Sequence, residues 1–192
     1  MSIFEFVFSL FGLVLGLSLA EVLAGFARTV QARARIRMGW LTPLLGLLLI
    51  IDLVSFWTGA WRERDALRIA LDPLLFATLI AGIYYVAASL VFPSDHDEWP
   101  DLDDYFMAQK KIVVIAVMGC NLLVIAGIVL LHGGAAMTAG RWAGYALFTA
   151  TALLLILTRS KRLSLVLLCA MVSYYWLVPQ LGALIDGGAA AG

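Results

Sequence analysis

The sequence predicts an all-α, polytopic membrane protein in which six transmembrane helices form a bundle. Hydrophobic residues make up 63% of the 192 residues and charged residues only 14%, whereas soluble domains have about 45–50% apolar and about 25% charged residues. Six segments are long and apolar enough to cross a hydrocarbon core about 30 Å thick, which takes roughly 20 residues. Basic residues also concentrate in alternate connections, as in other multi-pass proteins.

We expect one transmembrane domain over residues 1–192, with an acidic loop over 93–111. The predicted spans cover residues 3–27, 40–61, 69–92, 112–131, 142–158 and 163–185. The first apolar run is too long for the core of a signal peptide, and Glu5 is the only charged residue before Glu21. Because a signal peptide begins with positive charge, we interpret this run as a retained span.

Nine of the thirteen Lys and Arg residues lie in the first, third and fifth connections. They are Arg28, Arg33, Arg35, Arg37, Lys110, Lys111, Arg159, Lys161 and Arg162. The other four are Arg62, Arg64, Arg68 and Arg141. Basic connections stay in the cytoplasm, so both termini are expected outside. The segments around Glu21 and from Tyr84 to Tyr105 resemble parts of uncharacterised bacterial inner-membrane proteins, which implies that membrane and no particular activity.

The acidic loop holds six Asp and Glu residues together with His96. We expect its acids to pair with the arginines of the first connection on the cytoplasmic face. The alternative, a site for a hard cation, needs about six to eight oxygen ligands in fixed geometry. One histidine among scattered carboxylates supports it weakly, and we predict no metal.

Small residues recur every four positions along the first span, at Gly12, Gly16, Ala20 and Ala24. This spacing forms a smooth ridge on one helix face, where the backbone of another helix can approach closely. We therefore expect a helix contact there, either within a homo-oligomer or with another membrane protein.

Polar residues of all six spans fall within about 10 Å of each other in depth, at a rise of about 1.5 Å per residue. This predicted layer contains Glu21, Asp52, Tyr84, Tyr85, Asn121, Thr149, Ser173 and Tyr174. It has two interpretations. The groups line a path or pocket for a proton, an ion or a small polar solute, or they form hydrogen bonds that hold the helices in register.

The residues that identify common membrane enzymes are missing. Both histidines, His96 and His132, lie in predicted loops, and the lysines lie at predicted helix ends. These positions do not suit bundle haem ligands or a retinal Schiff base. Neither a phosphate-binding glycine loop nor a zinc-ligand spacing occurs, and no basic stripe indicates nucleic acid. We therefore predict no enzyme, no catalytic residue and no cofactor, with the lipid bilayer as the main surrounding.

Two functions follow. One is a small channel or transporter-like protein for protons, ions or a small polar solute, with Glu21 and Asp52 as its working residues. The alternative is a non-catalytic structural or assembly subunit of a membrane complex. The surroundings of the acids discriminate between them, because transport calls for a hydrated cavity and a subunit for sealed, hydrogen-bonded carboxylates.

Overall fold

The computed structural model describes residues 3–63, 71–95, 98–134 and 137–189, and side chains within residues 11–63, 74–95, 98–134 and 137–177. The described residues form six α-helices. These are α1 (Ile3–Gln31), α2 (Leu41–Arg62), α3 (Leu71–Ser89), α4 (Leu102–His132), α5 (Ala139–Leu157) and α6 (Lys161–Ala189). Of the residues used in the sequence predictions, Arg64, Arg68 and His96 lie outside this part of the chain.

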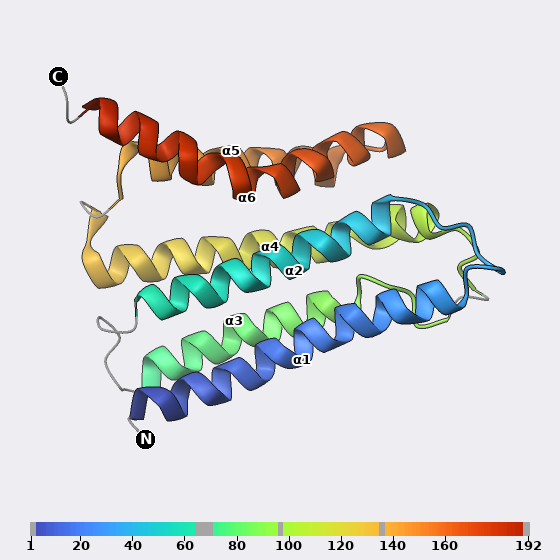
Figure 1. Ribbon diagram of the computed structural model, residues 1–192, viewed down its shortest axis with the longest axis horizontal. Coiled ribbons are helices and arrows are strands. Elements are labelled where there is room, and N and C mark those ends of the chain that lie inside the picture. The colour runs from blue at the N-terminus through green and yellow to red at the C-terminus, as the bar shows by residue number, and fades with distance from the viewer. Residues whose placement is uncertain (1–2, 64–70, 96–97, 135–136, 190–192) are drawn as a thin grey trace.

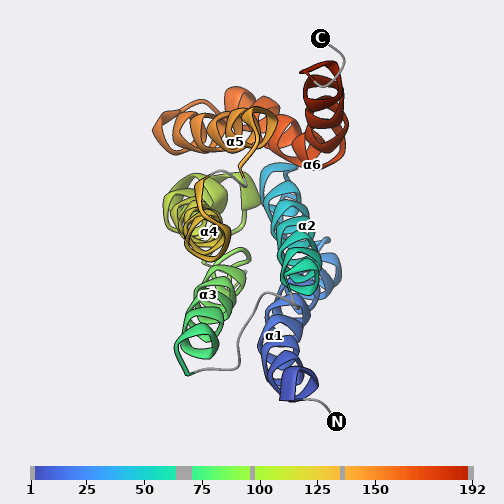
Figure 2. The same cartoon turned by 90° about the vertical axis from the view of Figure 1, so that its left-hand side faces the viewer.

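The six helices run alternately in opposite directions, so both ends of the chain lie at the same end of the bundle (Figure 1). Seen along the helices, they form three layers of two, with α1 beside α3, α2 beside α4, and α5 beside α6 (Figure 2). The middle layer joins the others, because α2 contacts both α1 and α6 while α4 contacts both α3 and α5. A side chain on α2 or α4 can therefore be enclosed from several directions.

Four helices within the described residues are long and apolar enough to cross a membrane. They contain Phe11–Gln31, Leu41–Arg62, Leu102–His132 and Ala139–Leu157. The described apolar part of α3, Leu74–Ser89, is shorter, and the side chains of α6 are described only as far as Leu177. The prediction of an all-helical bundle is confirmed. Of the six predicted spans, these four are supported, a pattern compatible with an integral membrane protein.

The sequence predicts a fourth span from residue 112, preceded by a short interfacial helix at Tyr105, Phe106 and Met107, whereas the structure has one continuous helix that begins at Leu102. The carboxylate of Asp101 accepts hydrogen bonds from the backbone N–H groups of Asp103 and Asp104, at 2.8 and 3.2 Å. An acidic residue in this position satisfies N–H groups that have no partner inside the helix. The second half of the acidic loop is therefore the first part of α4.

The first connection pairs with the loop before α4 through its backbone. The N–H of Arg37 donates to the carbonyl of Pro100 at 2.7 Å, and the N–H of Leu102 donates to the carbonyl of Arg37 at 3.3 Å. The guanidinium of Arg37 also lies 3.9 Å from the carboxylate of Asp101. The predicted contact between these two loops therefore occurs at Arg37, largely between main-chain groups.

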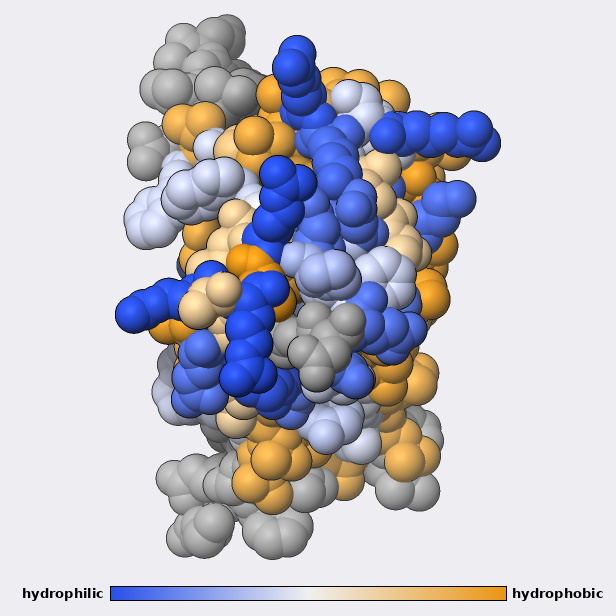
Figure 3. Space-filling model, turned by 90° about the vertical axis from the view of Figure 1, so that its right-hand side faces the viewer, coloured by the Kyte–Doolittle hydropathy of each residue, from blue (hydrophilic) through white to orange (hydrophobic). Residues whose placement is uncertain are grey.

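A second link between these loops lies at the start of α2. The carboxylate of Asp103 accepts a hydrogen bond from the N–H of Leu41 at 3.1 Å. A Cβ atom at Gly39 would lie 1.9 Å from the same carboxylate oxygen, so only glycine leaves room for this acceptor. Hydrophilic residues gather at this end of the bundle, where the connections carrying most of the Lys and Arg residues meet (Figure 3). We call it the arginine end.

Candidate functional site

Asp52 lies on the buried face of α2. Its neighbours on that face, Leu45, Leu48, Leu49 and Leu53, all belong to the hydrophobic core, and Asp52 itself is only 2% exposed. No ion pair joins Asp52 to another described residue. A carboxylate in such surroundings is expensive unless hydrogen-bond donors compensate for the lost water.

Donors from three other helices surround the carboxylate. The hydroxyl of Tyr84 on α3 donates to Oδ2 at 2.8 Å. The amide of Asn121 on α4 lies 3.2 Å from both carboxylate oxygens, and the hydroxyl of Tyr175 on α6 donates to Oδ1. Asp52 of α2 is thus the common acceptor for donors from three other helices. We call these four residues the Asp52 cluster.

Aromatic rings and a thiol enclose this cluster. The ring of Phe56 lies 5.5 Å from that of Tyr84, and Phe148 on α5 lies 6.1 Å from Tyr175, measured between centroids. The thiol of Cys120 is buried and lies 3.7 Å from the carbonyl oxygen of Ile80. The cluster is therefore a small polar centre inside apolar packing, able to hold a carboxylate or a proton.

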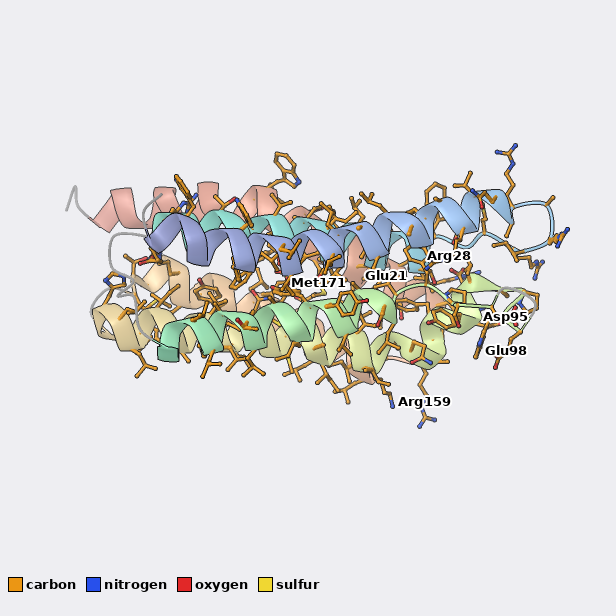
Figure 4. The ribbon with its side chains drawn as sticks, turned by 90° about the horizontal axis from the view of Figure 1, so that it is seen from below. Glu21, Arg28, Asp95, Glu98, Arg159 and Met171 are labelled. Carbon is orange, nitrogen blue, oxygen red and sulfur yellow. The ribbon has the colours of Figure 1, made fainter. Side chains whose placement is uncertain are left out.

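Glu21 does not join the Asp52 cluster. Its carboxylate pairs with the guanidinium of Arg28, two turns further along α1, at 3.0 Å. The two side chains are 32% and 42% exposed, respectively. Figure 4 shows both on α1, in the half of the bundle that leads to the end where Asp95, Glu98 and Arg159 lie. Of the two acids predicted to work together, the structure encloses only Asp52.

The other predicted members of the polar layer divide similarly. Tyr84 and Asn121 belong to the Asp52 cluster, whereas Tyr85 is 43% exposed and Ser173 is exposed. Thr149 and Tyr174 are half-buried. Tyr174 packs edge-on against Tyr175, with centroids 5.4 Å apart, and the hydroxyl that donates to the carboxylate of Asp52 belongs to Tyr175.

Sequence reasoning missed Tyr175 as a ligand of Asp52 and selected its neighbour Tyr174 instead. Adjacent helical residues point about 100° apart, so only one of the two can face α2. The Tyr174–Tyr175 pair indicated that a tyrosine hydroxyl could face the interior, but the sequence alone did not determine how α6 is rotated about its axis. Packing against α2 and α5 decides it.

The small-residue ridge has mixed surroundings. A Cβ atom at Gly12 would lie 2.4 Å from the ring of Trp57 on α2, whereas a Cβ at Gly16 would meet no atom within 4 Å. Ala20 is exposed and Ala24 is half-buried. Within the described chain, therefore, only the Gly12 end of the ridge serves as a close helix contact with α2.

Lys110 is a second buried ionisable residue, only 1% exposed. Its Nζ donates to the carbonyl of Thr158 at 2.6 Å and to the hydroxyl of Ser164 at 3.2 Å. Thr158 ends α5, and a cation is favourable beside the free carbonyls of a helix C-terminus. Lys110 therefore joins α4 to the turn between α5 and α6.

Comparison with known proteins gave no match to a family model, to a curated protein or to a solved structure. The fold and the site define a class only: an all-helical protein with apolar helices compatible with an integral membrane protein, and a buried carboxylate on α2 that accepts hydrogen bonds from α3, α4 and α6.

Proposed function

We propose that this chain is a six-span integral membrane protein that serves as a non-catalytic structural or assembly subunit, with the Asp52 cluster holding its helices in register. One observation carries the proposal. Asp52 is sealed from solvent and accepts direct hydrogen bonds from α3, α4 and α6. Sealed, hydrogen-bonded acids are what a subunit calls for, whereas a transport path calls for acids that face water.

The membrane placement has separate support. Large apolar side chains are exposed along the outer faces of the helices, among them Leu13, Leu79, Leu122 and Leu154. Lipid is the surrounding that such faces fit. Because nine basic residues belong to connections at the arginine end, we propose that this end faces the cytoplasm and that both termini face outside.

Flux measurements in proteoliposomes test the proposal. Vesicles that contain the wild-type protein should pass protons, alkali cations and small polar solutes no faster than empty vesicles. The matched variant is Asp52→Asn, which keeps the side-chain shape and removes the ionisable group. Flux that appears with the wild-type protein and disappears with Asp52→Asn would replace the subunit proposal with transport.

Transport of a proton, an ion or a small polar solute is the second candidate function. The energetic cost of an ionisable residue at position 52 favours this candidate. A charged carboxylate at mid-span costs about 2.5–3.5 kcal/mol on insertion scales. Three interhelical hydrogen bonds at an average of about 0.6 kcal/mol give roughly 2 kcal/mol. An amide at position 52 could form hydrogen bonds without the charge, so register alone does not require an ionisable side chain.

A further inference from the structure

Residues 32–40 form a short, ordered connection between α1 and α2. Both helices are among those long and apolar enough to cross a membrane. The N–H of Arg35 donates to the carbonyl of Ala32 at 2.8 Å, which closes a turn, and the side chain of Ile36 is only 8% exposed. Because the connection is turned back and held against the bundle, its exposed side chains lie at the level where lipid headgroups meet the ends of two spanning helices.

Three arginines of this connection face outward. Arg33, Arg35 and Arg37 are all exposed, and the side chain of Arg37 is 88% exposed. Within the described residues, the guanidinium groups of Arg33 and Arg35 form no hydrogen bond or ion pair, and that of Arg37 approaches only the carboxylate of Asp101, at 3.9 Å. Figure 4 shows nitrogen-tipped side chains on this connection that point away from the bundle. We call these three arginines the arginine patch.

The acids at the start of α4 are engaged by other groups. The carboxylate of Asp101 accepts hydrogen bonds from two backbone N–H groups of α4 and lies 3.9 Å from the ammonium of Lys161. Asp103 accepts a hydrogen bond from the N–H of Leu41, and Asp104 binds the ammonium of Lys161 at 2.6 Å. These carboxylates therefore leave most of the positive charge of the arginine patch uncompensated.

Exposed apolar side chains flank the arginine patch. Val30 is 46%, Met38 48% and Trp40 73% exposed. Tryptophan is enriched where membrane meets water, because its ring is apolar and its N–H is a donor. A small soluble anion would leave these apolar groups in water, whereas a lipid brings acyl chains directly beneath its charged headgroup. The surface therefore fits an amphipathic anion better than a free one.

We propose that the arginine patch, together with Trp40, binds the headgroups of anionic phospholipids. The planar guanidinium group offers paired N–H donors that match two oxygens of one phosphate group. A headgroup with net negative charge complements the patch, whereas a zwitterionic headgroup brings its own cation. The inference rests on the membrane placement in the proposed function, and it adds a class of lipid as the partner of the arginine end.

Lipid titration of the purified chain in detergent tests this inference. The wild-type protein is titrated with dioleoylphosphatidylglycerol and separately with dioleoylphosphatidylcholine, and native mass spectrometry counts the bound lipids. Phosphatidylglycerol should bind about tenfold more tightly, since basic side chains attract anionic headgroups. An excess of glycerol phosphate, the soluble headgroup, should not displace it. Equal affinities for the two lipids, or displacement by glycerol phosphate, would overturn the inference.

Removal of the patch locates the binding. The triple variant Arg33→Gln/Arg35→Gln/Arg37→Gln should bind phosphatidylglycerol about tenfold more weakly than the wild type, close to its affinity for phosphatidylcholine. An unchanged preference for phosphatidylglycerol in this variant, with its helix content intact, would overturn the role of the arginine patch.

The matched control removes the same charge elsewhere. Arg62, Arg159 and Arg162 are also exposed, so the triple variant Arg62→Gln/Arg159→Gln/Arg162→Gln lowers the net charge equally and leaves the arginine patch intact. It should keep the wild-type preference for phosphatidylglycerol. An equal loss in both triple variants would show attraction by net charge alone and would overturn a defined site.

This experiment and the flux measurement fail independently. A preference for phosphatidylglycerol that depends on the arginine patch, accompanied by Asp52-dependent flux, would overturn the subunit proposal and leave the lipid site standing. Equal binding of both lipids by a protein without flux would overturn the lipid site and leave the subunit proposal standing.

Discussion

The carboxylates of Glu21 and Asp52 lie on neighbouring helices, but their partners come from different distances along the chain. Glu21 pairs with Arg28, only seven residues away. The partners of Asp52 lie 32, 69 and 123 residues away. A single inserted helix can therefore satisfy Glu21, whereas Asp52 is satisfied only after α3, α4 and α6 have packed around α2. The comparison shows that an acid in an apolar helix reports on tertiary structure only when its partners are distant.

The strongest test of this difference is Asp52→Val. Valine fills similar space but accepts no hydrogen bond, so donors from three helices lose their partner, and we expect a loss of about 2–3 kcal/mol in the free energy of unfolding. Equilibrium unfolding in mixed micelles measures it. Glu21→Val should cost clearly less, and equal losses for the two variants would contradict the distinction.

A single donor should show a smaller effect. Tyr175→Phe removes one hydroxyl and should cost about 1 kcal/mol, within the range for hydrogen bonds between membrane helices. Tyr174→Phe makes the same chemical change at the adjacent position and should leave stability nearly unchanged. In the Asp52→Val background, Tyr175→Phe should cost almost nothing, because its acceptor is already gone. An undiminished cost there would show that Tyr175 acts through other contacts.

The Glu21–Arg28 pair should contribute below about 1 kcal/mol, because both side chains are partly exposed and such pairs are worth little. A double-mutant cycle with Glu21→Gln and Arg28→Gln, followed by thermal unfolding in detergent, measures the coupling. A coupling as large as that between Asp52 and Tyr175 would remove the contrast between a local pair and a tertiary one.

The smallest effect is expected at the arginine end. The Lys161 ammonium lies 2.6 Å from the carboxylate of Asp104, and this hydrogen bond raises the pKa of Lys161 above its ordinary value of 10.5. A raised pKa in the folded state adds stability that is fully present below pH 10.5 and is lost as the pH rises through the folded-state pKa. In the Lys161→Gln variant, the free energy of unfolding should therefore fall slightly less steeply with pH in the alkaline range than in the wild type. Arg162→Gln is the control and should leave the slope unchanged.

The sequence was sufficient to predict the six helices, because long apolar segments separated by charged ones leave few alternatives. It also identified Asp52, Tyr84 and Asn121, since polar side chains within apolar helices are conspicuous. It did not identify which faces of α1 and α6 turn inward. In water, alternating polar and apolar faces reveal a helix's rotation, but lipid-facing and core-facing residues are both apolar. Glu21 and Tyr174 were predicted only from their depth along the helix axis, and that depth does not determine which way a side chain points.

The burial of Lys110 was missed for a related reason. A lysine near the end of a predicted span is expected at the surface, yet Lys110 is enclosed by Thr158 and Ser164. Its burial depends on partners that sequence spacing does not reveal. The acids and lysines at this end act as caps and interhelical donors, in addition to setting the charge of the connection.

The contact of Lys110 with Thr158 also constrains how the protein is made. The ribosome synthesises Lys110 48 residues before the carbonyl that binds it, so the amine lacks this partner when α4 is made. We expect α4 to wait at the interface with this lysine hydrated until the α5–α6 hairpin has emerged. Arrival of the hairpin then supplies the carbonyl of Thr158 and the hydroxyl of Ser164 as partners for the amine.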